Sequence, residues 1–382
     1  MLQKNILFLL LSICTVCIIS CEPKEEPVIE VSEKWEIAGS FKEGLSHAKE
    51  INGALFASSR SGVYADAKTQ GSASDFNDLS LFIQGEIPYR LPLSDKLMVA
   101  INTAEVSILP AGSTRQDDAL VLNMREIDPE FTGFHFLHYY LCEQISINAN
   151  GNILVPYRSA KDGIQKNTPD FLLLKTLVND GKVTILEQKL IKEEHFLGIA
   201  TIRIMKNFPD FTRVTIDGKT FDIDSEGNLE LRFEKFSKSV QVGNEIITFA
   251  QLGPLDSNDF EVYKSDLSGE NNELIGSYGS VEISTLDKFL LTQMADDIYS
   301  VDGVIILRHL DRIYRVTMNS QKIALIELEN DGMGNGYITS VLQLDDETVF
   351  ATTLCDRGEI ISCGGFTKSI ENFFKPKAIK PI

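Results

Sequence analysis

The chain has 382 residues, of which 43% are hydrophobic and 24% charged, and its formal net charge is −19 at pH 7. So large an acidic excess repels phosphate backbones and anionic headgroups, which argues against nucleic-acid binding and against electrostatic docking to a membrane. The length is ample for one large core or two domains.

The first twenty residues have the pattern of an export signal. A single charge, Lys4, precedes an apolar run from Ile6 to Ile19, and Ser20-Cys21 follows it. The run is about 14 residues long, shorter than the roughly 20 that a spanning helix needs, and it has the size of a signal-peptide core. A small residue before a cysteine is what lipoprotein processing requires. We therefore expect a signal peptide over 1–20 and lipidation of Cys21.

The segment 21–34 is polar and proline-punctuated, so we expect a solvated tether after the lipidated cysteine. Its Lys24-Glu25-Glu26 triplet resembles the signal of surface-exposed lipoproteins in the Bacteroidota. That resemblance implies a lipid-anchored protein of the outer membrane, displayed at the cell surface. An acidic linker on an inward-facing periplasmic lipoprotein is the alternative. In either case the lipid anchor is the contact with the membrane.

From residue 35 to residue 382 the chain is a series of short apolar runs separated by Asn, Asp and Gly turns. A strand–turn–strand pattern recurs along the chain, with starts near 49, 92, 145, 198, 240, 281 and 341. Spacings of roughly 40–60 residues are typical of four-stranded propeller blades. The sequence therefore predicts an all-β fold, a β-propeller of seven blades, with six or eight as alternatives. A two-domain β-sandwich is the structural alternative.

The segment from Val28 to Ile37 carries the only tryptophan, Trp35. We expect it to supply a strand to the last blade and so to close the ring.

Two patterns resemble metal sites without completing one. The run from Asp222 to Gly227 begins like a calcium loop, but Phe233 stands where the bidentate glutamate is needed, so a polar hairpin is the preferred interpretation. His135 and His138 are three residues apart, and in a strand they would point to opposite faces. We therefore expect no metal and no cofactor.

The expected function is binding. The aromatic segment from Phe131 to Tyr140 and the stretch from Met294 to Gly336 depart most from the repeat, so they are the candidate contact surfaces. Aromatic faces can stack on sugar rings, and the candidate ligand-binding residues are His138, Tyr139 and Tyr140. The sequence favours a binding or scaffold module for a glycan, peptide or partner protein. The alternative is a propeller hydrolase or lyase acting on polysaccharide; no catalytic motif singles out residues for it.

Overall fold

The computed structural model describes most of the residues between 33 and 378. The described residues are 33–38, 45–51, 54–59, 62–67, 80–84, 96–111, 118–135, 145–148, 150–166, 169–192, 202–216, 218–234, 236–251, 260–277, 283–294, 297–319, 322–333, 336–354 and 364–378. Cys21, His138, Tyr139 and Tyr140 lie outside them.

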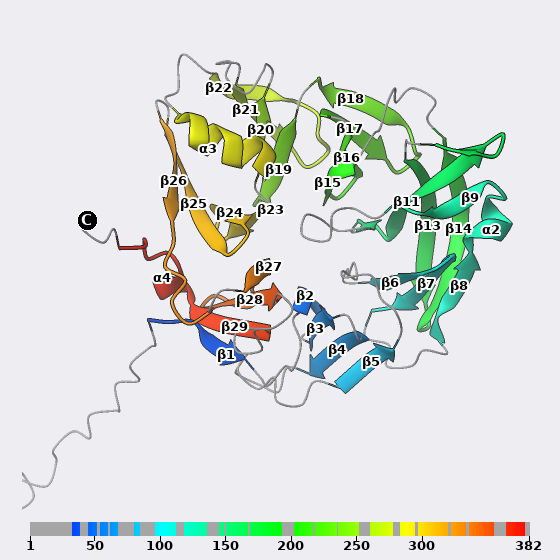
Figure 1. The fold of residues 1–382 in the computed structure, drawn as a ribbon, viewed down its shortest axis with the longest axis horizontal. Coiled ribbons are helices and arrows are strands. Elements are labelled where there is room, and N and C mark those ends of the chain that lie inside the picture. Colours follow the sequence, from blue (N-terminus) through cyan, green and yellow to red (C-terminus); the bar gives the residue numbers. More distant parts are fainter. Residues whose placement is uncertain are drawn as a thin grey trace, which may run out of the picture. The chain divides into compact units, whose positions relative to one another are not determined.

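The described strands form antiparallel sheets of strands that follow one another along the chain, except that β1 (Glu36–Ala38) joins the last sheet (Figure 1). The first two sheets contain β2 (Leu45–Ile51), β3 (Ala54–Ser59), β4 (Gly62–Ala67) and β5 (Ser80–Gln84), then β6 (Leu97–Asn102), β7 (Glu105–Pro110) and β8 (Leu120–Asn123). The third follows the short helix α2 (Met124–Ile127) and contains β9 (Phe131–Phe134), β10 (Ser146–Ile147), β11 (Asn152–Lys161), β12 (Ile164–Gln165), β13 (Asp170–Asn179) and β14 (Lys182–Ile191).

The remaining sheets have four strands each. They contain β15 (Ile202–Asn207), β16 (Phe211–Ile216), β17 (Lys219–Asp224) and β18 (Leu229–Phe233); then β19 (Ser237–Val242), β20 (Glu245–Gln251), β21 (Phe260–Asp266) and β22 (Glu273–Ser277); then β23 (Asp297–Val301), β24 (Val304–His309), β25 (Arg312–Met318) and β26 (Ile323–Glu327); and finally β27 (Tyr337–Gln343), β28 (Thr348–Leu354), β29 (Gly364–Ser369) and β1 (Glu36–Ala38).

The first strands of successive sheets contact one another, from β10 to β15, β19, β23 and β27, and β27 contacts β2. Figure 1 shows β2, β15, β19, β23 and β27 toward the middle, with the later strands of their sheets outside them. Apolar cores lie between neighbouring sheets; one, for example, joins Phe249 and Phe260 of the β19–β22 sheet to Leu307 and Tyr314 of the β23–β26 sheet. A sheet covered on both faces by its neighbours is the arrangement of a propeller blade. The fold is therefore an all-β propeller, as the sequence predicted, while the number of blades stays a prediction.

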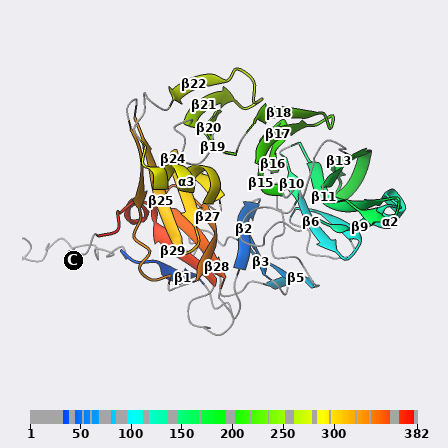
Figure 2. The same ribbon diagram turned by 45° about the horizontal axis from the view of Figure 1, so that its top comes forward.

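The strand β1 completes the last sheet from the other end of the chain. It pairs antiparallel with β29, Ile37 lying opposite Phe366, and both views show the two strands side by side (Figures 1 and 2). Trp35, only 3% exposed, packs edge-on against Phe373 of α4 (Ile370–Phe373). The strand expected around Trp35 is thus confirmed.

The strand–turn–strand prediction for the stretch near 281 was wrong. Ile283 to Leu291 was expected to form a strand, a turn and a strand, but α3 (Thr285–Phe289) and a π-helical turn (Leu290–Met294) stand there. The side chain of Ser284 accepts a hydrogen bond from the Asp287 backbone N–H, which caps the helix and explains its start.

The stretch from Met294 to Gly336, expected to be an irregular insertion, is instead mostly the regular β23–β26 sheet. Asp297 is the first residue of β23.

Candidate functional site

The first part of the candidate binding segment contains three buried residues, Phe131, Phe134 and His135. Phe131 and Phe134 are buried in the core shared by the β6–β8 and β9–β14 sheets, and their ring centroids lie 5.1 Å apart. His135 is 3% exposed, and its Nδ1 accepts a hydrogen bond from Arg158 Nε at 3.4 Å. Burial, and secondly the charge of Arg158, lower the pKa of His135 to about 4, so the imidazole is neutral at pH 7.

A polar network next to these buried residues fixes their position. Tyr157, which is fully buried on β11, donates to Asp128 Oδ2 at 2.7 Å, and Lys192 Nζ donates to Asp128 Oδ1 at 3.0 Å and to Glu130 Oε2 at 2.8 Å. Burial opposes ionisation of Asp128, but the hydrogen bonds from Tyr157 and Lys192 outweigh it and hold the pKa of the carboxyl below its ordinary value. Burial and the hydrogen bond to Asp128 raise the pKa of Tyr157.

A second buried pair lies on the same sheet. Ser159 on β11 donates to Asp170 on β13, and Lys166 Nζ lies 3.3 Å from the same carboxylate. Both Ser159 and Asp170 have no exposed surface, so this group cross-links strands and is closed to a large ligand.

The sequence-predicted residues therefore follow, along the chain, a stretch whose buried residues are fixed by packing and hydrogen bonds. Of the predicted cluster, the structure places His135 in the core, beside an arginine. A neutral, buried His135 with Arg158 on its Nδ1 is a packing residue rather than part of a contact surface. His138, Tyr139 and Tyr140 stay predictions.

The run that resembled a calcium loop is the β17–β18 hairpin, with Asp222 opposite Glu230 and Ile223 opposite Leu229. Asp224 Oδ1 accepts the backbone N–H groups of Glu226 and Asn228, which is the bonding of a polar turn. The hairpin interpretation is confirmed.

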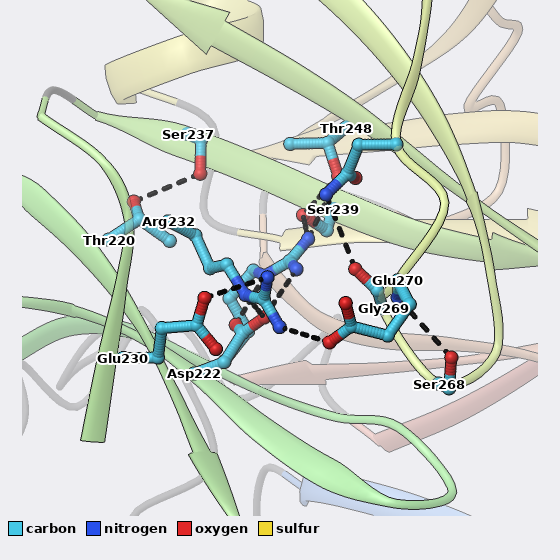
Figure 3. A network of polar contacts seen from close by, with 12 residues as sticks. Thr220, Asp222, Glu230, Arg232, Ser237, Ser239, Thr248, Ser268, Gly269 and Glu270 are labelled. Carbon is cyan, nitrogen blue, oxygen red and sulfur yellow. Dashed lines mark hydrogen bonds and ion pairs between the residues drawn. The ribbon is translucent and has the colours of Figure 1, made fainter.

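The carboxylate of Asp222 is held by two arginines in a network that joins two sheets (Figure 3). Arg213 Nε and Nη2 each donate to it at 2.7 Å, and Arg232 Nε donates at 3.0 Å. Arg213 Nη1 crosses to the neighbouring sheet and donates to Ser239 Oγ and Thr248 Oγ1, both at 2.9 Å. Arg232 reaches Glu270 at 2.8 Å.

This junction is closed to a ligand. Arg213 and Asp222 are 3% and 4% exposed, and the guanidinium of Arg213 lies 5.1 Å from the ring centroid of Phe211. Sequence reasoning missed the pair, although a signal was present. Asp217-Gly218 favours a two-residue hairpin turn, and that turn sets Arg213 opposite Asp222.

Within the described ranges, no group of three or more His, Cys, Asp or Glu side chains is placed so that it could hold a metal ion. No helix in the described part of the chain is both long and apolar enough to cross a membrane.

No protein-family model matches the chain, and no curated protein matches it. Among solved structures it is similar to virginiamycin B lyase from Staphylococcus aureus, at 10% identity over 86% of this chain and 96% of that chain, with a TM-score of 0.48. It is also similar to the extracellular domain of BT4673 from B. thetaiotaomicron, at 8% identity over 88% of this chain and 40% of that chain, with a TM-score of 0.47. Hsv2 from Kluyveromyces lactis matches at 9% identity over 74% and 85%, with a TM-score of 0.42. Because these scores are below 0.5, the propeller assignment rests on the chain's own sheets, and no function is carried over.

Proposed function

We propose that this chain is a lipid-anchored binding module of the outer membrane, displayed at the cell surface, that holds a glycan, a peptide or a partner protein. The anchor is Cys21, and the contact residues are Tyr139, Tyr140 and His138. The observation that supports the binding proposal is that Phe131, Phe134 and His135, just before the contact residues, are buried and hydrogen-bonded. Fixing one end of a contact segment in this way reduces the entropy that the segment loses when it binds.

The anchor is tested by metabolic labelling with a fatty-acid probe. The wild-type chain should be labelled and Cys21→Ala should not, while Cys17→Ala serves as a matched control that keeps its label. Label that persists in Cys21→Ala contradicts the assignment.

The contact segment is tested by screening the protein against glycans and envelope extracts and then measuring affinity. The double substitution Tyr139→Ala and Tyr140→Ala should weaken binding about tenfold or more, because the loss of each ring removes apolar contact area. The matched control is the pair Tyr139→Phe and Tyr140→Phe, which keeps both ring faces and should retain most of the affinity.

An affinity unchanged by the alanine pair excludes the aromatic segment as the site. Conversion of the bound glycan to product would instead indicate a propeller-type polysaccharide hydrolase or lyase.

A further inference from the structure

The segment 33–38, which contains β1, is anchored on both sides of the last sheet. Trp35 and Ala38 are buried, while Glu36 and Ile37 between them are exposed. Trp35 packs into the core that the last sheet shares with the β23–β26 sheet, and Ala38 packs into the core that it shares with the β2–β5 sheet. The segment is therefore an edge strand with two buried anchors.

Two later stretches of the chain form a socket around Trp35. The backbone N–H of Trp35 donates to the carbonyl oxygen of Asp331 at 2.8 Å, and its ring packs edge-on against Phe373, with the ring centroids 5.8 Å apart. The ammonium of Lys368 lies 5.7 Å from the centroid of the indole ring and donates to the carbonyl oxygen of Glu329 at 2.9 Å. A cation near an indole ring is attracted by the negative face of the ring.

Gly332 completes this socket and brings its backbone against the backbone of Trp35. The φ angle of Gly332 is +101°, and a Cβ at this position would overlap the carbonyl oxygen of Trp35. Glycine adopts such a conformation without strain and leaves the space that the carbonyl needs. The socket therefore fits the backbone of a strand as well as an indole ring.

The strand that the socket holds is short. β1 has three residues and pairs with β29 in the register that sets Glu36 opposite Thr367. Ahead of it, Glu33 and Lys375 form an ion pair between exposed side chains, which adds little stability. Trp35 Nε1 is buried, and no acceptor meets it among the described residues, which costs free energy. A short edge strand of this kind can detach locally while the sheets stay folded.

We propose that the edge of β29 and the Trp35 socket form a strand-binding site that the segment 33–38 of a second copy of this chain can occupy. A second copy is the favoured occupant, because it carries both buried anchors at the spacing that the site requires. Exchange keeps every contact of the segment, so the monomer and the exchanged dimer differ by the entropy of association and by the conformation of residues 39–44, which join β1 to β2. This exchange does not depend on the function proposed above.

Disulfide trapping between two full-length chains in detergent tests the exchange. One chain carries Glu36→Cys and the other carries Thr367→Cys, and opposite residues of antiparallel strands lie within reach of a disulfide. Mild oxidation of the mixture should give a disulfide-linked heterodimer. The matched control replaces Thr367→Cys with Thr184→Cys on the outer strand β14 and should give severalfold less heterodimer.

Trp35→Ala should have opposite effects in the two chains. In the chain with Glu36→Cys it removes an anchor of the donated strand and should reduce the heterodimer about tenfold. In the chain with Thr367→Cys it weakens the chain's own strand, which competes for the socket, and should increase the heterodimer severalfold. A merely unstable variant would not produce this reversal. If Trp35→Ala loses its sheets by circular dichroism, Trp35→Phe provides the same contrast with smaller effects.

A glycine pair locates the exchange in the socket. Gly332→Ala in the chain with Thr367→Cys should reduce the heterodimer severalfold, because the added methyl group takes the space of the Trp35 carbonyl oxygen. The matched control is Gly303→Ala, which also substitutes a glycine of positive φ but has open space around it, and it should leave the heterodimer unchanged.

A heterodimer no more abundant than with Thr184→Cys overturns the proposal, as does an effect of the Trp35 substitution that has the same sign in both chains. The double substitution Tyr139→Ala and Tyr140→Ala should leave the exchange intact, so this outcome is separable from that of the proposed aromatic site.

Discussion

The β16–β17 and β23–β24 hairpins are built alike, and their polar groups behave differently. In each, an Asp-Gly pair separates the strands and the register sets an arginine opposite an aspartate: Arg213 faces Asp222, and Arg308 faces Asp297. In the first hairpin the arginine binds the aspartate through two nitrogens, and a second arginine and two hydroxyl groups join the network. In the second, Lys206 on β15 donates from Nζ to the aspartate, and Arg308 donates to Tyr299 Oη and to the carbonyl oxygen of Ile338.

The difference teaches that an Arg–Asp pair alone does not define a role. Where the arginine binds the aspartate and both side chains are buried, the pair joins one sheet to the next; where the aspartate binds a partly exposed lysine instead, solvent screens the ion pair. The comparison can be tested by substitutions at both places.

The largest effect is expected at the closed junction. Arg213→Met should lower the free energy of unfolding by about 3–5 kcal/mol, because it removes one partner of a buried ion pair and leaves Asp222 under-compensated. Urea denaturation of the variant measures the change. Arg213→Met combined with Asp222→Leu should recover part of the loss, and a double variant as unstable as the sum of the single variants would contradict the account.

The next largest effect is the pH dependence of stability caused by His135, because burial disfavours the charged form of its imidazole. The folded-state pKa of about 4 lies below the ordinary value of 6.5, so the unfolded chain takes up the proton first as the pH falls. The stability contributed by the neutral imidazole is therefore complete above pH 6.5 and is lost between pH 6.5 and about 4, by up to about 3 kcal/mol. His135→Gln should flatten this part of the stability–pH profile; an unchanged slope would show that other groups cause it.

A smaller loss is expected when one acceptor is removed from the closed junction. Thr248→Val keeps the shape of the side chain and takes away one of the two hydroxyl acceptors of Arg213 Nη1, which should cost about 1–2 kcal/mol. Thermal unfolding measures it. A neutral result would mean that Ser239 alone satisfies the guanidinium.

The smallest effect on stability is expected at the Lys206–Asp297 ion pair. Lys206→Met should cost about 1 kcal/mol or less, because the Lys206–Asp297 pair is partly exposed and screened by solvent. Urea denaturation beside Arg213→Met gives the direct contrast. A loss as large as that of Arg213→Met would show that the Lys206–Asp297 pair stabilises the fold as much as the buried Arg213–Asp222 pair does.

Much of the fold was predictable from local signals. The recurring strand–turn–strand pattern predicted the hairpins that the structure has at 51–57, 147–155, 240–248 and 342–351. The helix at Thr285 was missed because its apolar residues also fit a strand pattern, and the capping role of Ser284 decided between the two.

The polar sites were less predictable, for a physical reason. The register of Arg213 and Asp222 follows from a two-residue turn and was accessible from the sequence. The contact of Lys206 with Asp297 spans two sheets and depends on how the strands converge, which no local pattern encodes. The aromatic segment was chosen for its composition and its departure from the repeat, and of its described residues Phe131, Phe134 and His135 are buried.

The pairing of β1 with β29 sets the order in which this chain can finish folding. Glu36 meets Thr367, so one of the first strands synthesised waits for nearly the last before its hydrogen bonds can form. Closing so long a loop adds little to the entropic cost of the native state, since that cost grows only with the logarithm of length, but non-local pairing slows folding. Until synthesis is complete, the face that receives Trp35 stays uncovered, and the nascent propeller is open on one side. The interval between making the first sheet and sealing the last is therefore the period in which this protein depends most on protection from aggregation.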